Sequence, residues 1–398
     1  MKIKYNYNDD KKILEIFFDL DLPNGDKTSY INHKNKTITL AKQHCKFILP
    51  SSFKRTHLHN DLVALSAVLI IYPFIGNKIE FLFQVSKPFC SELSKTGKRI
   101  EAPVKPYQHL NSRTTIKQAL AYSGGYDSTA ASILLPNDTV HVFLDRINPI
   151  SKQTLNYRKD QIYFSLDMLM KMKKNVVSIK TDLEYMREPT GFIFDLACGI
   201  PCILLSRFYN FKNINYGYVL HHLEQFNLDG LEPEYYCLGQ WKLYTKCNQF
   251  TKMINKFSFW DNLFEIVDLK ISFPLKNMSE IQTYRVVNNN KIYKLKFSSC
   301  MRGLVNKPCG KCKKCAKIKF LEFLNKSPKQ RLASLNKLLT LIKYILKQYG
   351  YSLKTICDYG NFELIGIFLA YYYHNIIPEL EQTYRKIKHK EDIIKKIF

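Results

Sequence analysis

Several features that would place a chain in a specialised class are missing from this sequence. Its 398 residues contain no low-complexity segment and no internal repeat of fixed period, which excludes solenoid and fibrous architectures. The polar start of mixed charge has no hydrophobic segment of a secretory signal peptide. The longest apolar run, residues 62–75, is interrupted by Ser66 and Pro73 and is shorter than the roughly 20 residues that cross a bilayer. We therefore expect a soluble, cytoplasmic protein without a membrane partner.

Disulfide bonds are not expected either. Thiols stay reduced inside cells, and the 11 cysteines are an odd number. The cysteines are therefore predicted to be free thiols or metal ligands.

The formal net charge of +26 admits two interpretations. An excess of this size favours polyanionic partners such as nucleic acid. However, the lysines are scattered, and the abundance of Lys, Asn, Ile, Tyr and Phe is typical of AT-rich coding. Phosphate-binding surfaces usually cluster their charge. We favour a solvated basic surface, and a nucleic-acid partner remains the less favoured alternative.

The length predicts two or three domains, because one hydrophobic core rarely organises 398 residues. Residues 1–112 are predicted to form an N-terminal α+β block, with short alternating strands and an apolar helix at residues 60–71 capped by Asn60 or Asp61. Residues 326–398 are predicted to form a C-terminal helical region, because their leucines recur at helical spacing.

Residues 113–325 are predicted to form an α/β domain with a Rossmann-like parallel sheet, because β-rich segments alternate with helical patterns. The predicted strands are residues 118–122, 139–144, 175–180, 214–220 and 265–273, and the predicted helices are residues 128–135, 155–173, 191–208 and 279–288. Ligands of such sheets bind beyond the carboxyl ends of the strands.

A glycine-rich loop follows the first predicted strand of this domain. It reads Ser123-Gly124-Gly125-Tyr126-Asp127-Ser128-Thr129. Glycines bring backbone N–H groups close to a phosphate, and a helix N-terminus adds donors and partial positive charge. The hydroxyls add further donors, while Asp127 could cap the helix or orient a metal ion or water. The loop is not a Walker loop, because no Gly-Lys-Ser/Thr follows. The alternative is a turn that only caps a helix.

Four cysteines form a second motif, with the spacing C-x8-C-x2-C-x2-C. They are Cys300, Cys309, Cys312 and Cys315. Four thiolates suit tetrahedral zinc and leave no open position, so the predicted knuckle at residues 300–315 is structural. An iron–sulfur centre and a group of buried thiols are the alternatives.

Together, the loop and the cysteine motif resemble 7-cyano-7-deazaguanine synthase and its relatives in the PP-loop ATP pyrophosphatase superfamily. That family pairs a Ser-Gly-Gly-x-Asp-Ser loop with a late zinc site of the same spacing. Phe273-Pro274-Leu275 and Ser279-Glu280-Ile281 resemble the segment that precedes the zinc site in the family. The resemblance covers about residues 116–320 and implies a fold of the adenine nucleotide alpha hydrolase type.

The resemblance also implies a reaction. The family adenylates the carboxylate of 7-carboxy-7-deazaguanine, releases pyrophosphate and adds ammonia. ATP and Mg²⁺ would bind at residues 123–129, with Asp127 and Ser128 in the reaction, and zinc would be structural. The predicted partners are a small-molecule or peptide carboxylate and an ammonia or amine donor, and a homodimer is left open.

The sequence departs from the family at the substrate side. The deazapurine-binding stretch after the fourth strand is absent from residues 216–225, and Leu144-Asp145-Arg146 replaces the family's Tyr-Gly-Gln after the second strand. The resemblance therefore supports the ATP half of the site only. Diverged relatives occur in antiphage defence clusters, so a role on a protein or nucleotide in defence is an alternative.

Polar residues near the predicted strand ends are candidates for the rest of the site. Asp145 ends the second strand and is predicted to contact the nucleotide, although a surface pair with Arg146 is the alternative. Arg187 follows the third strand and could stabilise a carboxylate or the charge of a transferred phosphoryl group. Its alternative role is a loop salt bridge.

Two further pairs have less specific interpretations. His221 and His222 end the fourth strand and could bind substrate or move a proton, or they could simply close the strand. Cys198 and Cys202 lie one helical turn apart, where core packing is favoured over a redox or thiolation pair.

Three functions remain open at this point. We favour an adenylating ligase that acts on a carboxylate. A tRNA-modifying PP-loop enzyme, for thiolation or ligation, would need a catalytic cysteine or an iron–sulfur centre outside the zinc motif. A binding module without catalysis is disfavoured because the loop is intact. A decayed site could have lost its glycines or Asp127 without harm to the fold.

Overall fold

The computed structural model contains two compact units. One unit comprises Met1–Leu155, Leu166–Tyr218 and Ile254–Pro274, and the other comprises Asn156–Ser165, Val219–Met253 and Leu275–Phe398. The described residues are 1–31, 37–106, 117–147, 159–218, 259–275, 278, 280–290, 300, 303–304, 307–310, 315, 318–319 and 321–322.

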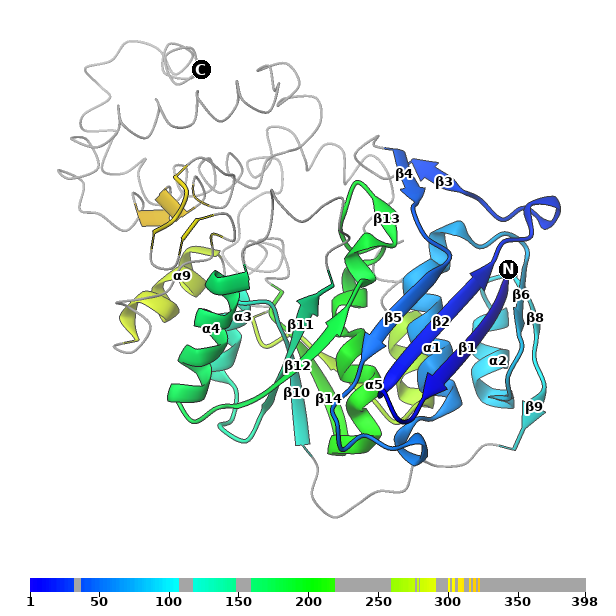
Figure 1. Cartoon of the computed structure of the whole chain (residues 1–398), viewed down its shortest axis with the longest axis horizontal. Helices are drawn as coiled ribbons and strands as arrows, with labels where there is room; N and C mark the ends of the chain where they lie inside the picture. Colours follow the sequence, from blue (N-terminus) through cyan, green and yellow to red (C-terminus); the bar gives the residue numbers. More distant parts are fainter. Residues whose placement is uncertain are drawn as a thin grey trace, which may run out of the picture. The chain divides into compact units, whose positions relative to one another are not determined.

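The first unit is built on a large, mostly parallel sheet, which confirms the predicted α/β class (Figure 1). Its described strands have the order β15-β14-β10-β11-β12-β5-β2-β1-β6-β8. One half is parallel throughout and consists of β15 (Lys270–Ser272), β14 (Phe211–Tyr216), β10 (Lys117–Tyr122), β11 (Val140–Arg146) and β12 (Asn175–Thr181). The other half is mixed and consists of β5 (His44–Ile48), β2 (Ile13–Asp19), β1 (Lys2–Asn8), β6 (Lys78–Phe81) and β8 (Arg99–Glu101).

The strand order of the parallel half creates a switch point beside β10. The chain runs from β10 outward to β11 and β12, then returns to β14 on the other side of β10 and continues to β15. This is the 3-2-1-4-5 order of doubly wound sheets, in which ligands bind where the order reverses. The connecting helices are α3 (Tyr126–Leu134), α4 (Lys159–Lys171) and α5 (Ile200–Tyr209).

One predicted strand begins later than expected. Residues 259–266 are helical, and only Lys270–Ser272 form β15, so the strand predicted at residues 265–273 was wrong in its first half. The buried residues Trp260, Leu263, Phe264 and Val267 follow a helical period. This segment packs its Trp260 ring against Tyr72, 5.5 Å between ring centroids.

The two halves of the sheet meet where β5 pairs antiparallel with β12, with Ile48 opposite Lys180 and Phe47 opposite Thr181. The sheet therefore continues across the boundary that was predicted near residue 112. Alternating patterns locate strands in a sequence but do not say which strands pair, because pairing is decided by contacts between distant segments. Whether residues 1–112, 113–325 and 326–398 fold as separate domains stays a prediction.

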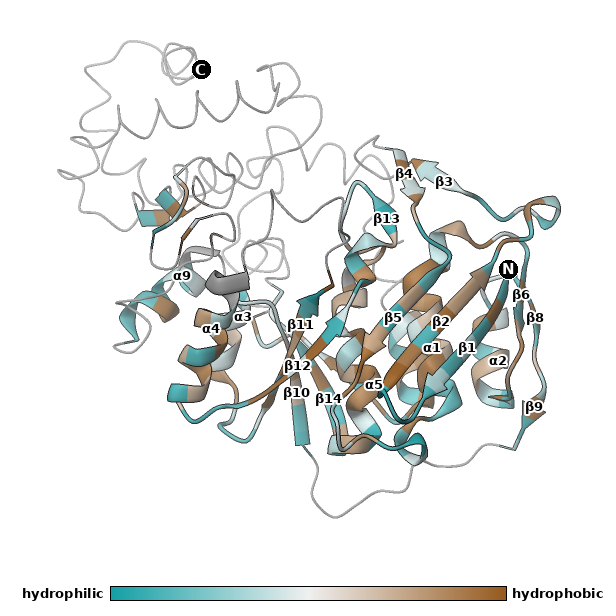
Figure 2. Cartoon of the chain, in the orientation of Figure 1, coloured by the Kyte–Doolittle hydropathy of each residue, from teal (hydrophilic) through white to brown (hydrophobic). Residues whose placement is uncertain are grey.

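The core of the first unit is centred on α1 (Asn60–Ile71), a helix that consists mostly of apolar residues (Figure 2). Every residue of α1 except Asn60 is buried, and the helix packs against α5. A helix of this kind must be enclosed on all sides. Its range agrees with the prediction, but its N-cap is His59, whose Nδ1 accepts from the Asp61 backbone N–H at 3.2 Å.

Smaller elements complete the described structure. A three-stranded sheet has the order β13 (Arg187–Glu188), β4 (Thr37–Leu40), β3 (Ser29–Ile31), and a two-stranded sheet joins β7 (Val85–Ser86) to β9 (Val104–Lys105), with α2 (Lys87–Ser94) between them in the chain. In the second unit, α9 (Glu280–Asn289) matches the helix predicted at residues 279–288. The predicted C-terminal helical region lies outside the described residues. Within the described parts of the chain, no helix is both long and apolar enough to cross a membrane.

A buried histidine links α3 to the sheet. His141 in β11 accepts a hydrogen bond from the Ser132 hydroxyl at Nε2 (2.7 Å), and its Nδ1–H donates to the carbonyls of Thr139 and Asn175, both at 3.1 Å. Burial is the main cause that lowers the pKa of His141 from 6.5 to about 4. The ring is therefore neutral in the folded protein and accepts a proton more readily after unfolding.

We predict that His141 makes stability fall as pH falls from about 6.5 towards 4. Because the pKa of His141 is lower in the folded than in the unfolded protein, the full stability is present above pH 6.5. About 3 kcal/mol of the free energy of unfolding is lost as the pH falls to about 4. Denaturant unfolding of the wild type and of His141→Gln at a series of pH values measures the effect. The stability of the variant should depend less steeply on pH than that of the wild type. Parallel pH profiles for the wild type and His141→Gln would contradict the assignment.

Candidate functional site

The carboxyl edge of the parallel half gathers most of the predicted site residues of the first unit. The glycine-rich loop leaves the end of β10, Asp145 and Arg146 end β11, Arg187 lies beyond β12, and Gly217 follows β14. In the sheet register, Ala121 of β10 lies opposite Tyr216 of β14, so the loop and Gly217 leave neighbouring strands at nearly the same level. This is the switch point at which doubly wound sheets bind ligands.

The loop forms a tight strand-to-helix turn. Gly124 has a φ of +74°, a left-handed conformation that favours glycine, and Gly125 is the N-cap of α3 without a side-chain cap. Asp127 therefore lies within the first turn of α3 and is not the cap that the sequence suggested. The N-terminus of α3 with this backbone turn is a suitable place for an anion.

The serine hydroxyls brace the turn from within. The Oγ atoms of Ser123 and Ser128 are 3.1 Å apart, the Ser128 hydroxyl donates to the Gly125 carbonyl at 3.1 Å, and the Gly125 N–H donates to Ser123 Oγ at 3.3 Å. Ser123 is exposed, whereas Ser128 is buried. Thr129 is fully buried, and its hydroxyl lies 3.1 Å from the Tyr122 hydroxyl, so it links the start of α3 to the end of β10.

Gly217 approaches the loop more closely than any other residue type would allow. A Cβ atom built on Gly217 would lie 2.7 Å from Ser128 Cα and 2.8 Å from Ser128 N. Real side chains do not reach such distances, so the backbone after β14 packs directly on the first turn of α3. Gly217 lies inside the strand predicted at residues 214–220, whereas β14 ends at Tyr216, so the last part of that prediction was wrong. A glycine within a predicted strand was the available signal for this close approach.

The ends of β11 and β12 are joined by an ion pair. Arg146 binds Glu184 through both its Nε and its Nη2, the latter at 2.7 Å from Glu184 Oε1. The side chains are 17% and 10% exposed, so this bidentate pair is largely shielded from water. Asp145, the predicted nucleotide contact, is buried at the end of β11.

Arg187 extends from β13, which pairs with β4 of the N-terminal block. Its Nε is buried and has no hydrogen-bond acceptor among the described residues. Its guanidinium lies against Gly191, where a Cβ atom would be 2.5 Å from Arg187 Nη2. Arg187 forms no ion pair with another of the described residues, whereas Arg146 pairs with Glu184.

The remaining candidates from the sequence are a pair of cysteines and a pair of histidines. Burial raises the pKa of the Cys202 thiol well above its usual range, with the nearby Cys198 as a further cause, which disfavours a reactive thiolate. Cys198 Sγ lies 3.2 Å from the Tyr218 hydroxyl. His221 and His222 lie outside the described residues.

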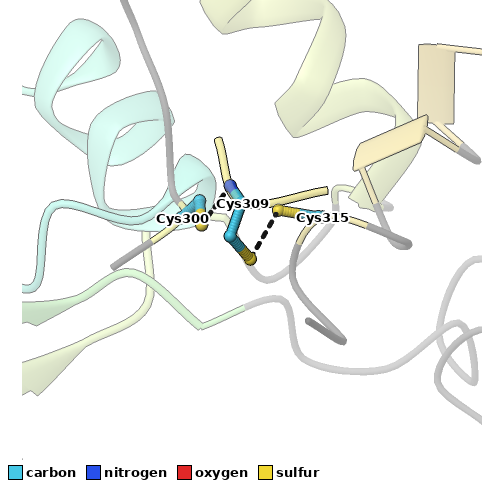
Figure 3. Close-up of side chains that lie close together, drawn as sticks. All are labelled: Cys300, Cys309 and Cys315. Carbon is cyan, nitrogen blue, oxygen red and sulfur yellow. Dashed lines mark hydrogen bonds between the residues drawn. The ribbon is translucent and has the colours of Figure 1, made fainter. Parts of the chain in front are cut away.

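In the second unit, three of the four predicted cysteine ligands lie together (Figure 3). The sulfur atoms of Cys300, Cys309 and Cys315 are all within 4.8 Å of one another, and those of Cys309 and Cys315 are 3.7 Å apart. The Cys309 backbone N–H donates to Cys300 Sγ at 3.3 Å. The cluster could hold a metal ion. Cys312 lies outside the described residues.

A glycine also shapes this cysteine segment. A Cβ atom on Gly303 would lie 2.3 Å from the Lys307 carbonyl oxygen, and Gly310 has a φ of +69°. Gly303 allows the chain to turn back between Cys300 and Cys309, and Gly310 lets it bend again directly after Cys309. The sulfurs therefore converge because the backbone around them turns twice.

We predict that Gly217→Ala destabilises the first unit. The added methyl group would force the backbone away from Ser128, which typically costs about 1–3 kcal/mol. Gly125→Ala is the control, since a Cβ atom there would meet only Ser123 Oγ at 3.4 Å, and the change should cost no more than about 1 kcal/mol. Denaturant unfolding compares the two variants, and equal stabilities would show that the approach of Gly217 to the loop is not a constraint.

Comparison with known proteins gives one match. A family of unknown function (DUF6395) matches residues 259–360, which is less than half of the chain and includes the four cysteines. No curated protein and no solved structure matches the chain.

Proposed function

We propose that this chain is an ATP-dependent adenylating ligase resembling 7-cyano-7-deazaguanine synthase. It would activate a carboxylate as an acyl-adenylate, release pyrophosphate and pass the acyl group to ammonia or an amine. The observation that carries the proposal is the position of the loop. A Ser-Gly-Gly-x-Asp-Ser turn leaves the strand at which the order of the sheet reverses and opens a helix N-terminus without a side-chain cap.

The loop residues have separate roles in this proposal. The backbone around Gly124 and Gly125 binds the β- and γ-phosphates of ATP, aided by the N-terminus of α3. The exposed Ser123 hydroxyl donates to a phosphate oxygen, and the adjacent Ser128 hydroxyl does the same by turning away from the Gly125 carbonyl. Asp127, on the first turn of α3, binds Mg²⁺ directly through a carboxylate oxygen or through one of the waters of the ion. Carboxylate oxygens and waters are the ligands that Mg²⁺ prefers.

Residues at the ends of the next two strands complete the proposed site. Asp145 contacts the nucleotide, and Arg187 offers charge-assisted hydrogen bonds to an oxyanion. The acceptor is left as a carboxylate of small-molecule or peptide origin, because residues 216–225 do not carry the family's deazapurine motif.

Zinc is the proposed ion of the cysteine cluster. Tetrahedral zinc with Zn–S bonds of about 2.3 Å holds its sulfurs about 3.8 Å apart. The separation of 3.7 Å between Cys309 and Cys315 fits this geometry. Cys312 is the proposed fourth ligand, which would close the site and give it a structural role.

The decisive experiment is ATP consumption by the purified full chain with Mg²⁺. It resolves AMP and pyrophosphate from ADP and phosphate, with 7-carboxy-7-deazaguanine and ammonium present or absent. AMP that depends on the deazapurine identifies a synthase. If AMP forms only with a different carboxylate, such as that of a peptide, the proposed adenylation is supported and that carboxylate is the acceptor. No AMP with any acceptor would sink the proposal in favour of a binding role.

For the loop, we predict that Asp127→Ala and Ser128→Ala each lower AMP formation by about 100-fold or more, a typical loss when a group that stabilises phosphoryl or oxyanion charge is removed. Both variants should remain folded in denaturant unfolding. Ser91→Ala, which changes an exposed serine on α2, is the matched control and should keep wild-type activity. Wild-type rates in both loop variants would remove the loop from the active site.

For the cysteine cluster, we predict about one zinc ion per chain by elemental analysis. Cys315→Ser and Cys312→Ser should each lose the zinc together with much of the soluble protein, because structural zinc supplies folding free energy. Cys90→Ser changes a cysteine outside the cluster and should keep both. Bound iron with visible absorption would identify an iron–sulfur centre instead, and zinc-loaded Cys315→Ser would refute the ligand assignment.

A further inference from the structure

We infer that the N-terminal block builds an oxyanion-binding site around Arg187 at the carboxyl edge of the sheet. The inference rests on the proposed function only for the identity of the anion, which in that reaction is the carboxylate of the acceptor. The site itself follows from the contacts of Arg187.

The first observation is a buried donor that lacks an acceptor. Arg187 Nε is shielded from water and has no hydrogen-bond partner within the described ranges of the chain. A guanidinium carries five N–H donors and a permanent charge, and it matches the two oxygens of a carboxylate or phosphate. Buried donors are nearly always satisfied, and a bound oxyanion would satisfy the Nε of Arg187.

The buried acids on the same loop are already engaged. Glu184 is held by Arg146 in the bidentate pair at the end of β11. Asp182 forms an ion pair with Lys42 and accepts from the Lys46 backbone N–H at 2.8 Å. Neither carboxylate is therefore committed to Arg187, which keeps the guanidinium suitable for an external anion.

The N-terminal block holds Arg187 in place. β13 pairs with β4, with Arg187 opposite Leu40, and the Ala41 N–H donates to the Met186 carbonyl at 2.9 Å. On the other side, Gly191 has a φ of +153° and its N–H donates to the Glu184 carbonyl at 2.9 Å. The guanidinium packs on this glycine at a distance that leaves no room for a side chain.

The location agrees with a role beside the phosphate loop. The loop leaves β10, and β12 lies two strands from β10 in the large sheet; Arg187 follows six residues after β12, in β13 of the three-stranded sheet. Neighbouring strands are about 4.8 Å apart, so the ends of β10 and β12 are separated by roughly 10 Å. An acceptor whose carboxylate is near Arg187 can thus lie beside a nucleotide on the loop.

Calorimetric titration of the full chain with inorganic phosphate tests the inference. Arg187→Gln should weaken phosphate binding by about tenfold or more. Gly191→Ala should do the same, because its methyl group displaces the guanidinium. Gly97→Ala is the matched control: Gly97 also has a positive φ, +77°, but nothing lies within 4 Å of its Cβ position, so phosphate affinity should not change. Denaturant unfolding of each variant shows that it is folded.

Ser128→Ala separates this inference from the proposed function. Binding that is lost in Arg187→Gln and kept in Ser128→Ala supports an anion site at Arg187, and it does so even if no AMP is ever formed. Binding that is lost only in Ser128→Ala places the phosphate on the loop and overturns the inference while keeping the loop. Wild-type affinity in folded Arg187→Gln, or no phosphate binding by the wild type at millimolar concentration, also overturns it.

Discussion

The antiparallel pairing of β5 with β12 joins the two halves of the large sheet, and much of the described structure depends on it. The pairing involves few residues, but Asp182 reinforces it by binding Lys42 and the Lys46 backbone. A carboxylate that is shielded from water and bound by both a cation and an amide is costly to release. This junction joins two sets of strands that are distant in sequence into one continuous sheet.

The junction also brings the N-terminal segment to the carboxyl edge of the parallel half. After β12 the chain enters β13, which pairs with β4, so Arg187 is positioned by residues that precede the glycine-rich loop by more than 80 positions. The ion pair of Arg146 with Glu184 joins the ends of β11 and β12 beside it. Rigid elements on both sides are what an anion site needs, because a preorganised donor loses little freedom on binding.

Close backbone contacts shape both candidate sites. Gly217 packs on the first turn of α3, Gly191 packs on the guanidinium of Arg187, and Gly303 lets the cysteine segment turn back on itself. Each glycine is needed because a neighbour occupies the space of a side chain, and none of these neighbours is adjacent in sequence. The matched family of unknown function includes the cysteine segment, whereas the loop lies outside the match.

The sequence alone determined the features that depend on local order. The alternation of β-rich and helical segments indicated the α/β class, the apolar run at residues 60–71 indicated α1, and the spacing of the cysteines indicated a cluster of which three members are close together. The tertiary structure decided which strands pair, that Gly217 packs on the loop, and that Glu184 is engaged by Arg146 while Arg187 Nε has no acceptor among the described residues. The reason is physical: helical period, turn chemistry and ligand spacing act between near neighbours in the chain, whereas strand pairing and ion-pair choice depend on contacts between segments that only the folded chain brings together.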